Sequence, residues 1–106
     1  MLVLFPHSDL RTAKTRPALV VQANDLDSGV AQVIVAMISG RMFRAGHPSR
    51  VVIDIESPTG RASGLLGASV VMADNLATVS VLAIDRVIGS VSMPAIDDAL
   101  RHTFAL

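Results

Sequence analysis

Short apolar segments rich in valine and isoleucine, separated by turn-forming residues, run along most of this 106-residue chain. Apolar runs of about four to eight residues, bounded by Gly, Pro, Asn, Asp or Ser, are typical of strands. The pattern predicts strands over residues 2–5, 18–23, 30–38, 50–55, 65–72, 78–82 and 86–88. It predicts polar loops or turns over residues 8–15, 24–29, 40–49, 57–60 and 73–75.

One helix is predicted, at the C-terminal end of the sequence. Ser92 is a suitable N-cap, and Pro94 fits the first turn because its missing N–H would have no helical partner there. A stripe of apolar residues at helical spacing follows: Met93, Ile96, Leu100 and Phe104. The sequence therefore predicts a mainly β, antiparallel fold with a C-terminal helix, in which a compact barrel would remove exposed strand edges.

Composition narrows the class of protein. The length fits a single domain over residues 1–106, and 51% of the residues are apolar, with only three aromatic side chains, all Phe. The formal net charge is zero, so no overall electrostatic attraction to nucleic acid is expected. The chain has no cysteine, which excludes disulfides and thiolate metal sites, and no signal peptide or membrane span is visible. A soluble cytoplasmic protein without a cofactor is predicted.

Six of the nine Lys and Arg residues fall into two clusters, and the first lies in the polar segment 8–16. It contains Asp9, Arg11, Lys14 and Arg16, which suits anion binding but is also ordinary for a solvated loop. Arg16 precedes Pro17, and the residue before a proline is driven toward extended geometry. An ordered arginine at the start of a strand can be directed at a phosphate or a carboxylate, or can simply begin the strand.

The second basic cluster follows the predicted strand 30–38. Arg41, Phe43, Arg44, His47 and Arg50 lie within ten residues, a combination that favours phosphate pairing and base stacking with nucleic acid. The alternative is that Phe43 packs back onto the core.

Ser39 and the three histidines complete the list of candidates. The Ser39 hydroxyl either satisfies a local backbone group or faces a substrate. His7 and His47 flank strands and could act as acid and base in RNA cleavage, whereas His102 is predicted on the helix surface. No metal-ligand spacing, catalytic triad, P-loop or dinucleotide motif is present in the sequence.

Taken in order, several of these segments resemble the MazF/PemK toxins, and the PemK-like branch in particular. The resemblance is carried by Leu-Phe-Pro-His-Ser-Asp-Leu at 4–10, Lys-Thr-Arg-Pro-Ala-Leu-Val-Val at 14–21, and the segments 35–40, 44–51, 64–79 and 89–91. It implies an SH3-like antiparallel β-barrel with a C-terminal helix, usually a homodimer. It further implies the toxin of a type II toxin–antitoxin pair, with a cognate antitoxin as partner and metal-independent, sequence-specific cleavage of single-stranded RNA as its activity.

The resemblance also assigns residues. It places the catalytic arginine at Arg16 and the catalytic hydroxyl at Ser39, with Asp74 and His7 as possible supporting residues. It implies RNA and antitoxin binding by the two basic clusters: Arg11, Lys14, Arg41, Arg44, His47 and Arg50. In such cleavage the 2′-OH attacks the adjacent phosphate, and a fixed guanidinium stabilises the charge on its oxygens.

Four departures from the family pattern bear on activity. Position 39 carries Ser instead of Thr, position 77 carries Ala where many relatives have Arg, and His7 replaces an aromatic residue. The Gly-Asp or Gly-Glu stretch that usually precedes the first strand is missing, as in a shortened N-terminus. The alternative function is therefore a catalytically weak or inactive member that acts by binding protein or nucleic acid. It would be a regulator, or a gyrase-poison-like toxin in which residues 104–106 matter more than Arg16.

Overall fold

The computed structural model describes residues 1–8, 13–22 and 29–106, and of residues 5–8, 13 and 14 it describes the backbone alone. The strands are β1 (Leu2–Ser8), β2 (Ala13–Val20), β3 (Gln32–Ser39), β4 (Arg50–Ile53), β5 (Ser69–Ser80) and β6 (Arg86–Gly89). The α-helices are α1 (Pro58–Ser63) and α2 (Pro94–Phe104), and two short 3-10 helices are η1 (Met42–Arg44) and η2 (Val81–Ala83).

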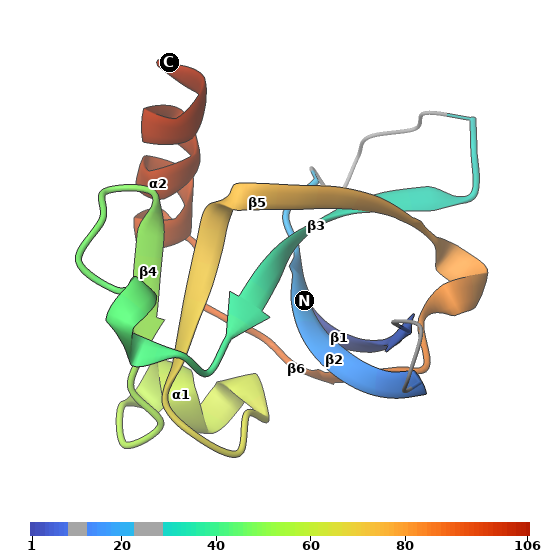
Figure 1. The fold of residues 1–106 in the computed structure, drawn as a ribbon, viewed down its shortest axis with the longest axis horizontal. Helices are drawn as coiled ribbons and strands as arrows, with labels where there is room; N and C mark the ends of the chain where they lie inside the picture. Colours follow the sequence, from blue (N-terminus) through green and yellow to red (C-terminus); the bar gives the residue numbers. More distant parts are fainter. Residues whose placement is uncertain (9–12, 23–28) are drawn as a thin grey trace.

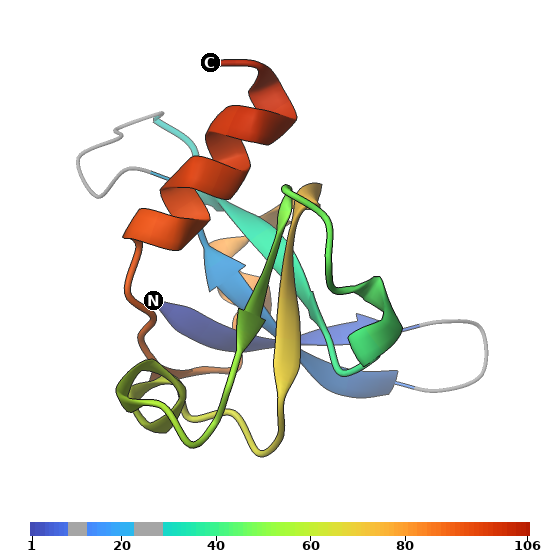
Figure 2. The ribbon, with the colours of Figure 1, turned by 90° about the vertical axis from the view of Figure 1, so that its left-hand side faces the viewer.

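The strands form one sheet in the order β4-β5-β3-β2-β1-β6, and every neighbouring pair is antiparallel. The sheet curls strongly, so that β1, β2 and β6 curve around one side of the molecule (Figure 1). On the other side, β4 and the first half of β5 lie side by side, and α2 packs against both strands (Figure 2). The mainly β, antiparallel fold with a C-terminal helix is confirmed.

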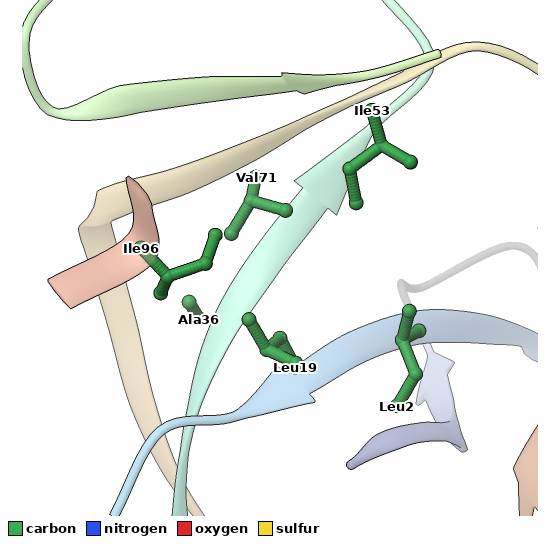
Figure 3. Packing of buried hydrophobic residues seen from close by; sticks show 6 residues of the cluster. All are labelled: Leu2, Leu19, Ala36, Ile53, Val71 and Ile96. Atoms are coloured by element: carbon green, nitrogen blue, oxygen red, sulfur yellow. The ribbon is translucent and has the colours of Figure 1, made fainter. Parts of the chain in front are cut away.

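The core is aliphatic and joins the sheet to the C-terminal helix. Figure 3 shows six of its residues, one from each of β1 to β5 and one from α2: Leu2, Leu19, Ala36, Ile53, Val71 and Ile96. All six are at most 2% exposed to solvent. Burial of this kind is worth about 1.5–3 kcal/mol for each large aliphatic side chain. The core therefore fixes the strands that carry the candidate site residues relative to one another.

Strand β5 corrects the prediction of two strands separated by a loop at residues 73–75. It is one strand of 12 residues that bends sharply near its middle (Figure 1). Its register with β3 jumps from Met37 opposite Met72 to Ala36 opposite Leu76. Residues 73–75 therefore form a bulge, which re-aims side chains without ending the strand. Asp74 and Asn75 indicated from the sequence where the strand is irregular, but they did not distinguish a bulge from a loop.

Two further segments predicted as loops or turns, at 8–15 and 57–60, contain strand or α-helix. Residue 8 and residues 13–15 are paired in β1 and β2, which are both longer than predicted, whereas β2 ends at Val20 rather than at residue 23. The turn predicted at residues 57–60 is the start of α1. There Ser57 is the N-cap and accepts a hydrogen bond from Gly60 N–H at 3.0 Å. A Ser-Pro pair suits a turn and a helix start equally well. Most of the turn predicted at residues 24–29 lies outside the described residues.

Helix α2 has Pro94 in its first turn, as predicted, but it begins at Pro94 and Ser92 does not cap it. The N-cap is Met93, which makes no side-chain capping bond. Of the predicted stripe, Ile96 is buried, whereas Phe104 is 55% exposed and does not belong to the core. In the part of the chain that the structure describes, no helix has both the length and the apolar character needed to cross a membrane.

Candidate functional site

One groove of about 550 Å³ brings together the two residues to which catalytic roles were assigned, Arg16 and Ser39. Its lining comes from β2, β3, the start of the β3–β4 connection and the β5 bulge: Arg16, Met37, Ile38, Ser39, Gly40, Arg41, Arg44, Met72 and Asn75. The strand register explains this. Ala18 is opposite Met37 in the β2–β3 pair, so continuing the same antiparallel register by two residues sets Arg16 opposite Ser39.

Arg16 lies within β2, not at the loop-to-strand junction that its proline suggested. It is opposite Phe5 of β1, and pairing of β2 with β3 begins only at Ala18. Pro17 therefore lies at a free edge of β2, where a missing N–H is tolerated. Arg16 is exposed, and none of the acidic residues in the described ranges lies within ion-pair distance of it. Its guanidinium is available to an anion in the groove.

Ser39 is the last residue of β3 and is half-buried. Its Oγ accepts a hydrogen bond from Arg41 N–H at 3.1 Å, which is the local backbone role considered from the sequence. A serine hydroxyl has two acceptor sites and one donor, so this bond leaves its O–H free to donate. The hydroxyl can therefore shape the turn and contact a ligand in the groove at the same time.

Asp74 and Arg50 form a bidentate ion pair next to the groove. Arg50 Nη2 donates to Asp74 Oδ2 at 2.9 Å, and Arg50 Nε donates to Asp74 Oδ1 at 3.3 Å. Arg50 Nη1 also donates to the carbonyl oxygen of Arg44 at 3.1 Å. Arg50 therefore joins η1 to the β5 bulge. Neither Asp74 nor Arg50 lines the groove with Arg16 and Ser39.

This pair changes the titration of both partners. The hydrogen bonds from Arg50 lower the pKa of Asp74, partly opposed by desolvation. The same bonds raise the pKa of Arg50 further above its ordinary value. Because the Asp74 pKa is lowered on folding, the pair stabilises the protein above the unfolded-state pKa of this carboxyl. That stabilisation is lost as pH falls through the lowered folded-state value.

Replacing Arg50 with glutamine should raise the pKa of Asp74 toward its ordinary value, since the charge-assisted bonds to the carboxylate are lost. An NMR pH titration of the Asp74 carboxyl carbon measures this change. The difference in unfolding free energy between the two proteins should be larger at neutral pH than below the titration range of Asp74, where only the loss of the bond to the Arg44 carbonyl remains. Arg101→Gln, which breaks the exposed Arg101–Asp98 pair, is the control and should leave Asp74 unchanged. An equal Asp74 midpoint in wild type and Arg50→Gln would contradict the prediction.

His47 lies away from the groove and is tied to the C-terminal helix. Its Nδ1 accepts a hydrogen bond from Ser49 N–H at 3.0 Å, and its ring meets His102 edge-on with 5.9 Å between centroids. Thr103 Oγ1 donates to Ser49 Oγ at 2.8 Å in the same contact. His102 is on the helix surface, as predicted, but it contacts this loop. A role of His47 in RNA binding stays a prediction.

The remaining candidates, His7, Lys14 and Arg11, are described only in part or not at all. His7 is opposite Lys14 in the β1–β2 pair, but only their backbone is described, and Arg11 lies outside the described residues. Sequence reasoning missed Asn75, which lines the groove because it sits in the β5 bulge. Among the described residues, no group of three or more His, Asp or Glu side chains could hold a metal ion.

Comparison with solved structures finds close matches to the whole fold. The Mycobacterium tuberculosis toxin MazF-mt6 is 27% identical with a TM-score of 0.76, and the match covers 100% of this chain and 98% of that chain. An endoribonuclease from a mycobacterial species, solved in complex with its cognate antitoxin, is 24% identical with a TM-score of 0.74. That match covers 99% of this chain and 91% of that chain, and at this identity it shows the fold alone.

Comparison with protein families agrees with these structures. Residues 1–104 match the family described as PemK-like, MazF-like toxin of type II toxin-antitoxin system. No curated protein sequence matches the chain significantly. The family match spans every strand and both α-helices, including the groove with Arg16 and Ser39. The chain therefore belongs to the PemK-like, MazF-like family of toxins of type II toxin–antitoxin systems.

Proposed function

We propose that this toxin is an endoribonuclease that cleaves single-stranded RNA at short sequences without a metal ion. The observation that carries the proposal is that Arg16 and Ser39 line one groove. Arg16 is exposed there and makes no ion pair with a carboxylate among the described residues. The groove also receives Arg41 and Arg44, which suits a polyanionic strand. One structural neighbour is an endoribonuclease, which is consistent with this activity.

The proposed reaction uses the substrate's own nucleophile. The 2′-oxygen attacks the adjacent phosphorus as its proton passes to solvent, and the bond from phosphorus to the 5′-oxygen breaks as that oxygen takes up a proton from solvent. The products carry a 2′,3′-cyclic phosphate and a 5′-hydroxyl. Negative charge grows on the non-bridging oxygens as the 2′-oxygen approaches. A guanidinium stabilises that charge with paired N–H donors, which is the role proposed for Arg16. The Ser39 hydroxyl would donate to the same phosphate and hold it in line.

Incubating the purified protein with a long single-stranded RNA in EDTA tests this function. We expect cleavage at a limited set of sites, with cyclic phosphate and 5′-hydroxyl ends on the fragments. Mapping the ends gives the recognition sequence. Intact RNA after incubation with a folded protein, or fragments with 5′-phosphate ends, would contradict the proposal.

The partners proposed for this toxin are a cognate antitoxin and a second copy of the same chain, both in the cytoplasm, where RNA is translated. A structural neighbour is described in complex with its cognate antitoxin. The arginine-lined groove is where a disordered acidic segment of the antitoxin would compete with RNA. Phe104 and Leu106, exposed at the end of α2, offer apolar surface for a homodimer.

A further inference from the structure

A second hollow, of about 380 Å³, adjoins the groove on the side of η1. Its lining is Phe43, Arg44, Arg50, Met72, Asp74 and Asn75. Three of these residues, Arg44, Met72 and Asn75, also line the groove that contains Arg16 and Ser39. The two hollows therefore lie side by side and share a wall.

Phe43 lines the second hollow and is largely exposed to solvent. It is 78% exposed, the most exposed of the aromatic side chains that the structure describes, so the alternative that it packs onto the core is wrong. The guanidinium carbon of Arg44 lies 5.8 Å from the centroid of the Phe43 ring, within the range of a cation–π contact. Exposing most of a phenylalanine ring to water is unfavourable, and no apolar side chain of the core covers it.

Arg44, which lies beside the Phe43 ring, is held in place by the residues around it. Arg44 Nη1 lies 3.7 Å from the Met72 sulfur, and the Arg44 carbonyl accepts the bond from Arg50 described above. Arg50 is in turn fixed by Asp74. The floor of the hollow is thus an ordered network on the β5 bulge, while the Phe43 ring stands open at its rim.

We propose that Phe43 is a stacking platform for one nucleobase of the RNA, beside the phosphate that is cleaved. An exposed aromatic ring next to an arginine is the surface on which single-stranded bases stack. The polar groups of the hollow suit the edge of a base, since Asp74 can accept and the Asn75 amide can both donate and accept hydrogen bonds. The assignment rests on the proposed ribonuclease function and adds a residue that holds one base of the strand in place.

The experiment is a binding titration that compares Phe43 variants on RNA oligonucleotides with single abasic positions. The oligonucleotide contains the mapped cleavage sequence, with a 2′-deoxy sugar at the cleaved position so that it cannot react. In wild type, one abasic position next to the cleaved phosphate should weaken binding by about 5- to 100-fold. Phe43→Leu should bind the intact oligonucleotide about as weakly, and should lose nothing more at that abasic position. Phe43→Trp should keep wild-type affinity and the wild-type response.

Met42→Ala is the matched control, because Met42 is an exposed neighbour in η1 that lines neither hollow. It should behave as wild type. If Phe43→Leu weakens binding equally at every abasic position, or leaves binding of the intact RNA unchanged, the stacking assignment is overturned while cleavage stands. If Phe43→Leu loses antitoxin binding but keeps RNA binding, Phe43 is a contact for the antitoxin, and the stacking assignment is overturned. If the wild-type protein cleaves no RNA, the proposed ribonuclease function is itself contradicted.

Discussion

Replacing Arg16 with alanine is expected to abolish RNA cleavage, lowering kcat/KM by roughly 10³-fold or more. Arg16 is exposed and lines the groove with Ser39, and extending the β2–β3 register by two residues places it opposite Ser39. In the attack of a 2′-oxygen, charge accumulates on the phosphate oxygens in the transition state. A donor fixed on a strand stabilises that charge more than it stabilises the bound substrate, so its loss lowers kcat.

Two further variants make this prediction specific. Arg16→Lys keeps the charge but loses the planar pair of donors, so it should recover only part of the activity. Arg61→Ala removes an exposed arginine on α1 that does not line the groove, and should cleave RNA as wild type does. Circular dichroism and thermal unfolding should be unchanged in all three. Retention of cleavage by folded Arg16→Ala would contradict the assignment of the site.

The residues of the groove could be found from the sequence only in part. Arg16 and Ser39 came from the resemblance to the family, and the antiparallel register then explains why residues 23 positions apart meet. Asn75 could not be placed, because its orientation depends on a three-residue bulge that no periodicity reveals. Arg50 looked like one more basic residue of the cluster, and its pairing with Asp74 depends on contact between β4 and β5.

The fold was predicted best where the signal is local. Alternating or continuous apolar runs identified β1, β3 and β4, and the helical stripe identified α2. The predictions were wrong where one local sequence pattern is compatible with two different structures. Ser57 and Pro58 suit a turn or a helix start, and only packing of α1 beside β6 decides between them. The polar segment 13–15 is a strand because β1 pairs with it, which is a tertiary contact that propensity does not contain.

That packing of α1 on β6 leads to the second large effect. Gly89 lies in β6 opposite Leu2 of β1, with its backbone against the end of α1. A Cβ at Gly89 would lie 2.3 Å from the carbonyl oxygen of Ala62 and 2.4 Å from the carbonyl carbon of Ser63. On the facing side, Gly64 ends α1 with a φ of +75°, and a Cβ there would lie 2.1 Å from the carbonyl oxygen of Ile88. Glycine is required at both positions, because the backbones of α1 and β6 approach each other too closely to leave room for a Cβ.

Gly89→Ala should therefore lower the free energy of unfolding by about 3 kcal/mol or more. The atoms in its way are backbone, so no side-chain rotation relieves the clash, and α1 or β6 must shift. A shift would also strain the hydrogen bond from Ser90 N–H to the Ala62 carbonyl, at 3.0 Å. Urea denaturation measures the change, with Gly67→Ala as the control, since a Cβ at Gly67 meets nothing within 4 Å. Equal midpoints for the two variants would mean that the contact between α1 and β6 is looser than the structure describes. Because β6 pairs with β1, and β1 with the strand that carries Arg16, a displaced β6 should also lower cleavage.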